Sequence, residues 1–138
     1  MRVLVDTSVW ADFFNGFASR EERALSRLIA GDDEICTCGV VVAEVLQGLR
    51  KPQGRREIER LFRELLFLEP SAIDTYIRAA NIYRLLPRRG VTVRSTIDCL
   101  VAALAEQGDC DVLSRDKDLD AILGSGLVKA RLFPIEAG

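Results

Sequence analysis

The sequence contains no histidine, and this absence removes several classes of enzyme. Histidine is the base of Ser-His-Asp triads and Cys-His dyads, and it is a common ligand of catalytic zinc. Ribonuclease chemistry that relies on a pair of histidines is excluded for the same reason. An enzyme built from this chain must use carboxylates, hydroxyls, lysine, cysteine or metal-activated water.

Long hydrophobic runs are also absent. No apolar run approaches the roughly 20 residues that a membrane helix needs. The N-terminus lacks a basic region followed by a long apolar core, so no signal peptide is expected. We therefore expect a cytoplasmic protein with no membrane partner.

Cysteine is scarce, with four residues at positions 36, 38, 99 and 110. Their spacing matches neither a disulfide framework nor paired CxxC zinc sites. We expect buried free thiols, which fits a reducing cytoplasm.

The 138 residues are 49% apolar and 29% charged, which is typical of one globular domain spanning residues 1–138. The net charge of −2 gives no global attraction to nucleic acid. Any contact with RNA would need local basic patches or bound cations.

Short apolar runs alternate with helical patterns along the whole chain. This alternation predicts an α/β fold, with a parallel sheet covered by helices on both faces. In such sheets ligands bind beyond the carboxyl ends of the strands. A capping box of Ser71 and Asp74 is expected to open one helix. The expected strands are 2–6, 34–38, 66–70, 110–114 and 129–134, and the expected helices are 7–15, 20–30, 39–50, 55–67, 71–86, 95–107 and 116–124.

Two acids in the first part of the chain have structural and functional interpretations. Asp6 follows the first strand, where it can cap the next helix or hold a metal ion. Glu44 has apolar neighbours on every side of its helix, and burial of an unpaired carboxylate costs several kcal/mol. We therefore expect a buried Glu44 that needs a partner or a cation. A Glu44 that faces solvent on a half-exposed helix is the weaker alternative.

Two further acids stand at the starts of later helices. Asp98 fits a capping box with Ser95, yet the helix that it opens is almost wholly apolar. Asp116 follows another strand, and the structural alternative is a solvated acidic helix start shared with Asp118 and Asp120. Four converging carboxylates would repel one another unless divalent cations were bound, and oxygen ligands favour Mg²⁺ or Mn²⁺. The residues alone thus indicate metal-dependent phosphoryl transfer or hydrolysis.

Four segments carry a resemblance to a known family. "VLVDTSVWADFF", "VVVAEVLQGL", "STIDCLVAALA" and "VLSRDKDLDAI" resemble, in order, the motifs of PIN-domain ribonucleases, especially VapC-type toxins of type II toxin–antitoxin systems. The resemblance implies a three-layer α/β/α sandwich around a five-stranded parallel sheet. It implies that the catalytic, metal-binding acids are Asp6, Glu44, Asp98 and Asp116, with Ser8 and Ser114 as accessory polar residues.

The resemblance also implies an activity and partners. It implies a Mg²⁺- or Mn²⁺-dependent endoribonuclease, a homodimer, and a cognate VapB-type antitoxin whose tail crosses the active-site groove. The alternatives are a non-catalytic PIN-like binding module and a housekeeping RNA-processing nuclease. A phosphatase with an aspartyl nucleophile would need a second acid two residues after Asp6, where Ser8 stands.

Basic residues near the acids are candidates for contact with RNA phosphates, although solvation alone explains each of them. Arg94 is the best candidate because it lies four residues before Asp98. Trp10 and the phenylalanines are expected in the core. The other candidates for contact with RNA phosphates are Lys51, Arg55, Arg56, Arg88 and Arg89.

Overall fold

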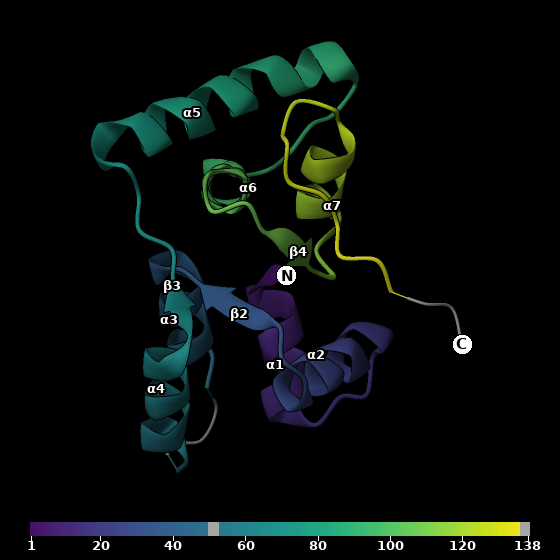
Figure 1. The fold of residues 1–138 in the computed structure, drawn as a ribbon. Helices are drawn as coiled ribbons and strands as arrows, with labels where there is room; N and C mark the ends of the chain where they lie inside the picture. Colours follow the sequence, from purple (N-terminus) through teal and green to yellow (C-terminus); the bar gives the residue numbers. More distant parts are fainter. Residues whose placement is uncertain (50–52, 136–138) are drawn as a thin grey trace.

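Four parallel strands form the centre of the fold in the computed structural model, which describes residues 1–49 and 53–135 (Figure 1). The order β3-β2-β1-β4 places the first strand in the interior of the sheet. All pairings are parallel, as the sequence predicts. The strands are β1 (Arg2–Val5), β2 (Glu34–Thr37), β3 (Leu66–Phe67) and β4 (Asp111–Leu113).

The expected fifth strand over 129–134 is wrong for the described residues. Only one parallel bridge forms there, between Val112 and Leu132. The chain leaves β4 after Leu113, and Pro134 has no amide hydrogen to donate to a ladder. The segment 129–134 therefore adds a single β-bridge beside β4.

Helices cover both faces of the sheet (Figure 1). The connections from β1 to β3 run on one side, and those that lead to and follow β4 run on the other, as right-handed crossovers require. One side carries α1 (Thr7–Asn15), α2 (Arg20–Ala30), α3 (Gly39–Gln47) and α4 (Arg55–Glu64); the other carries α5 (Ala72–Leu85), the short 3₁₀ helix η1 (Leu86–Arg89), α6 (Thr96–Gln107) and α7 (Lys117–Gly124).

Side-chain caps open several of these helices. The side chains of Ser19 and Ser95 accept hydrogen bonds from the backbone amides of Glu22 and Ile97 at the starts of α2 and α6. The capping box expected at Ser71 does not form. The Ser71 side chain makes no cap bond, and its amide instead donates to Thr75 Oγ1 at 2.7 Å.

The core lies between the sheet and these helices. Trp10 is fully buried against Phe62 of α4, with ring centroids 5.2 Å apart, and it stacks on Phe14 at 5.6 Å. This confirms the prediction that Trp10 belongs to the core. All four cysteines are free and buried, as expected. Within the described part of the chain, no helix is long and apolar enough to span a membrane.

The topology positions the candidate site. The chain runs from β1 toward β2 on one side, while β4 lies on the other side of β1, so the strand order reverses between β1 and β4. Val5 pairs with Leu113, which brings the carboxyl ends of these strands to the same level. Ligands of open parallel sheets bind at such a reversal.

Candidate metal centre

Asp6 lies at the reversal between β1 and β4, where its carboxylate accepts hydrogen bonds from the backbone and from two hydroxyls. It is the N-cap of α1, because its carboxylate accepts a 3.3 Å hydrogen bond from the Ser8 amide. The same oxygen accepts bonds from two hydroxyls, Ser8 Oγ at 2.8 Å and Ser114 Oγ at 3.4 Å. The residue is 6% exposed, and this burial raises the pKa of Asp6. The cap observed here remains compatible with a metal-binding role.

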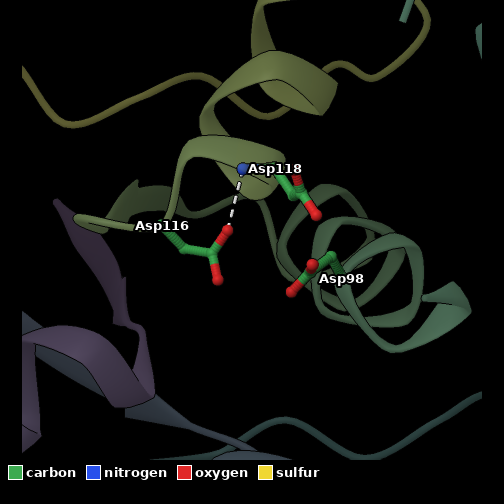
Figure 2. Close-up of side chains that lie close together, drawn as sticks. All are labelled: Asp98, Asp116 and Asp118. Carbon is green, nitrogen blue, oxygen red and sulfur yellow. Dashed lines mark hydrogen bonds between the residues drawn. The ribbon is translucent and has the colours of Figure 1, made fainter. Parts of the chain in front are cut away.

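Three other carboxylates face one another from α6 and from the start of α7 (Figure 2). Oxygens of Asp98, Asp116 and Asp118 lie within 4.8 Å of one another. Asp116 is the N-cap of α7, where its Oδ1 accepts from the amides of Asp118 at 2.8 Å and Leu119 at 3.3 Å. We call Asp98, Asp116 and Asp118 the aspartate cluster.

The electrostatics of the aspartate cluster are unfavourable without a cation. Burial raises the pKa of Asp98 to about 7, and the charges of Asp116, Asp6, Asp118 and Glu44 add to this rise. A carboxyl group resists ionisation when it is desolvated beside like charges. The charges of Asp6, Glu44 and Asp116 all reach Asp98, so the four acids singled out from the sequence lie in one region.

Glu44 differs from the expectation, because its side chain is exposed. Helix α3 buries Val41 and Val45, and Glu44 lies on the neighbouring open face. Its Oε1 accepts a 2.9 Å hydrogen bond from Thr7 Oγ1 at the start of α1. The expected burial of Glu44 is therefore wrong, although its bond to Thr7 keeps it at the end of the sheet where Asp6 lies.

Asp118 and Asp120 follow Asp116 closely in the sequence, and the structure places them differently. Asp118 belongs to the aspartate cluster, whereas Asp120 lines a hollow of about 300 Å³ together with Leu113 and Ser114. Burial, followed by the charge of Asp116, raises the pKa of Asp120 to about 6. The pattern Asp-x-Asp at a helix start is the signal that could have included Asp118 with Asp116.

Arg94 stands at the rim of the aspartate cluster. Its backbone amide and its Nε both donate to Asp118 Oδ2, at 3.3 and 3.2 Å. The Arg94 side chain is 89% exposed, whereas that of Asp118 is 20% exposed. Contact between Arg94 and RNA stays a prediction.

The other basic candidates have varied surroundings. Arg55 approaches Glu59 at 3.9 Å, and Arg89 Nη1 donates to the carbonyl of Ser125 at 3.2 Å. Lys51 lies outside the described residues. Arg56 and Arg88 are exposed.

Arg115 and Asp12, which were not among the residues expected at the site, hold the loop between β4 and α7. Arg115 Nη1 donates to Asp12 Oδ2 across 103 positions of sequence, and the Arg115 amide donates to Ser8 Oγ at 3.0 Å. No sequence pattern marks this pair, because opposite charges so far apart in the chain are common.

Comparisons with known protein families, sequences and structures match most of the chain. Residues 3–123 match the family model of the PIN domain. Ribonuclease VapC11 of Mycobacterium tuberculosis is 35% identical over 121 residues, which covers 87% of this chain and 90% of the relative.

Solved structures show the same fold at lower identity. VapBC-1 of nontypeable Haemophilus influenzae aligns with a TM-score of 0.69 and 16% identity over 96% of this chain and 97% of that one. VapBC2 of Rickettsia felis, bound to a promoter DNA fragment, aligns with a TM-score of 0.67 and 18% identity over 88% and 93%. At these identities the likeness establishes the fold alone.

Proposed function

Because this chain belongs to the PIN-domain family, among its VapC ribonucleases, we propose that it is a metal-dependent endoribonuclease and the toxin of a type II toxin–antitoxin pair. The observation that carries the proposal is the aspartate cluster, in which three carboxylates approach within 4.8 Å at the carboxyl end of a parallel sheet. A binding module has no need for such repulsion.

The donors fit a hard divalent cation. All the acids in question offer oxygen, which Mg²⁺ and Mn²⁺ prefer over nitrogen or sulfur. We assign the metal-binding role to Asp6, Glu44, Asp98 and Asp116, and we add Asp118 as a further candidate ligand. When bound, the cation would supply an activated water molecule and offset the charge of the scissile phosphate.

The residues of the chain itself organise this site. Ser8 and Ser114 hold the Asp6 carboxylate from two sides, so its orientation is fixed before substrate arrives. Thr7 fixes the Glu44 carboxylate in the same way. The N-termini of α6 and α7 lie at the aspartate cluster, where their dipoles favour negative charge.

Arg94 is proposed to guide the RNA backbone to the acids. Asp118 tethers it, and its exposed guanidinium is free on the solvent side to meet a phosphate. Arg94→Ala should weaken RNA cleavage more than it weakens Mn²⁺ binding. Unchanged cleavage would remove Arg94 from the substrate path.

An antitoxin is the proposed protein partner. Two of the solved relatives carry the name VapBC, and this family of complexes suggests a cognate VapB-type chain for this protein as well. A shallow hollow of about 130 Å³ lies between α1 and α3, next to Glu44. Its apolar side chains Phe14, Val45 and Leu49 would receive the apolar residues of an antitoxin segment.

A second copy of the chain is the other proposed partner. Helix α5 exposes a large apolar face of Ile73, Tyr76, Ile77 and Tyr83, which are 68%, 53%, 49% and 41% exposed. Exposed apolar faces rich in tyrosine are typical of interfaces. We place the protein in the cytoplasm, where its four free thiols would stay reduced.

Cleavage of cellular RNA by the purified, antitoxin-free protein tests the function. Wild type should cleave with Mg²⁺ or Mn²⁺, chelator should stop the reaction, and Asp6→Asn should abolish it. Asp32→Asn, which changes an exposed acid in a bend remote from the site, is the matched control and should cleave normally. A folded protein that neither binds Mn²⁺ nor cleaves would favour the binding module, and cleavage without growth arrest on expression would favour the housekeeping nuclease.

A further inference from the structure

Asp12 is a buried acid that joins three separate segments. It lies in α1 with a side chain 12% exposed, and its Oδ2 accepts a 2.7 Å hydrogen bond from Ser19 Oγ at the start of α2. The same oxygen accepts from Arg115 Nη1 in the loop that follows β4. A buried carboxylate needs such partners, because an unpaired one is costly.

Arg115 is held at both its backbone and its side chain. Its amide donates to Ser8 Oγ at 3.0 Å, and its guanidinium reaches Asp12 one helical turn further along α1. The guanidinium also lies over the ring of Phe17, 5.1 Å from the centroid. One face of α1 therefore fixes this residue of the loop at two points.

The neighbours of Arg115 are the residues that build the site. Ser114 Oγ donates to Asp6 Oδ2 at 3.4 Å and accepts from the Asp116 amide at 2.9 Å. Asp116 then belongs to the aspartate cluster. A movement of Arg115 would shift its chain neighbours Ser114 and Asp116 relative to Asp6, which follows β1.

We propose that Asp12 and Arg115 are positioning residues, whose ion pair sets the spacing between Asp6 and Asp116 and thereby the affinity of the site for a divalent cation. This inference rests on the proposed metal-dependent function. Outer partners of metal ligands commonly have this effect, and their loss weakens metal binding about 10- to 100-fold.

Two simple explanations predict opposite signs for one variant. If Arg115 acted only as a positive charge near the acids, Arg115→Ala would remove the repulsion between its guanidinium and the bound cation. Cation binding would then become tighter. If Arg115 positions the loop, the same variant loosens Ser114 and Asp116, and cation binding weakens. The direction of the change separates the two explanations without any measurement of RNA cleavage.

The chain offers a matched control pair. Arg131 Nε donates to Asp111 Oδ1 at 3.0 Å, and the Asp111 side chain is 14% exposed, close to the 12% of Asp12. Asp111 opens β4, so this pair lies at the opposite end of the strand from the site. Arg131→Ala removes a comparable ion pair without touching the acids.

The experiment is calorimetric titration with Mn²⁺ of wild type, Arg115→Ala, Arg115→Lys and Arg131→Ala. We expect Arg115→Ala to weaken Mn²⁺ binding about 10-fold or more. Arg115→Lys should recover part of this loss because it can keep the ion pair, and Arg131→Ala should bind like wild type. If Arg115→Ala fails to fold, Asp12→Asn tests the same ion pair. This variant keeps the shape of the side chain, and it should also weaken Mn²⁺ binding.

Equal or tighter Mn²⁺ binding by folded Arg115→Ala or Asp12→Asn would overturn the positioning role and leave the proposed function intact. Equal weakening by Arg131→Ala would also overturn it, because the effect would then reflect general loss of stability. A wild-type protein that binds no Mn²⁺ would overturn the proposed metal site itself, and this inference with it.

Discussion

The ionised form of Asp98 costs folding free energy when no cation is bound, so Asp98→Asn should stabilise the metal-free protein. Asp98 is half-buried, and burial together with the charges of the neighbouring acids raises its pKa to about 7. Asparagine has nearly the same shape and carries no charge. The substitution therefore removes repulsion without opening a cavity.

The expected stabilisation by Asp98→Asn follows from the pKa of Asp98. A rise from the ordinary value of 3.8 to about 7 corresponds to about 4 kcal/mol, at 1.36 kcal/mol for each pKa unit. Because Asp98 is partly exposed, screening by solvent reduces this to about 2 kcal/mol.

Protonation of Asp98 is linked to folding, so the free energy of unfolding depends on pH. The folded-state pKa lies above the unfolded one, so the contribution of protonated Asp98 is fully present below about pH 4 and is lost as pH rises through about 7. The wild type should therefore lose about 2 kcal/mol relative to Asp98→Asn between pH 4 and pH 8.

Urea unfolding in the presence of chelator, at pH 5 and pH 8, measures this difference. Asp98→Asn should exceed wild type by about 2 kcal/mol at pH 8 and by less than about 1 kcal/mol at pH 5. Asp32→Asn removes an acid at an exposed bend away from the site, and it is the control variant. A variant that is no more stable than wild type at pH 8 would refute the idea that the acids repel one another.

Three further predictions concern the core, the site and a remote ion pair. Trp10→Ala should lower the free energy of unfolding by about 3–5 kcal/mol in urea titrations followed by circular dichroism, because Trp10 is fully buried. Ser114→Ala removes a hydroxyl from Asp6 and should weaken Mn²⁺ binding about 10-fold in calorimetry. Hydrogen bonding to Arg78 lowers the pKa of Glu106, so Glu106→Gln should cost about 2 kcal/mol at pH 7, and its difference from wild type in urea unfolding should shrink as pH falls below about 4. Its Mn²⁺ affinity should match that of wild type.

Much of the fold could be predicted because local patterns and strand connectivity agree. The short apolar runs at β1, β2 and β4 are buried on both faces, as parallel strands between helices must be. Asp6, Asp98 and Asp116 could be singled out because each stands at the end of a strand or at the start of a helix. Position along the elements, rather than residue type alone, carried that prediction.

The errors have physical causes that a single sequence does not reveal. Glu44 was expected to be buried because Val and Ala surround it, yet α3 packs mainly through Val41 and Val45. The fifth strand was expected over 129–134, but only Leu132 pairs with β4, and Pro134 has no amide hydrogen to donate to a ladder.

Long-range polar contacts were the least predictable feature. The Asp12–Arg115 pair depends on how α1 faces the loop after β4, and only the assembled fold defines that relation. The same holds for the bond between Thr7 and Glu44. These contacts connect the predicted acids to the scaffold.

Electron paramagnetic resonance of Mn²⁺ during addition of protein shows whether the acids of the site hold a cation. We expect wild type to remove the signal of free Mn²⁺ through a saturable site. Asp98→Asn and Asp116→Asn should lose this capacity, while Asp32→Asn should retain it. If all four proteins bound Mn²⁺ equally, or if none bound it, the carboxylates would have no role in holding a cation.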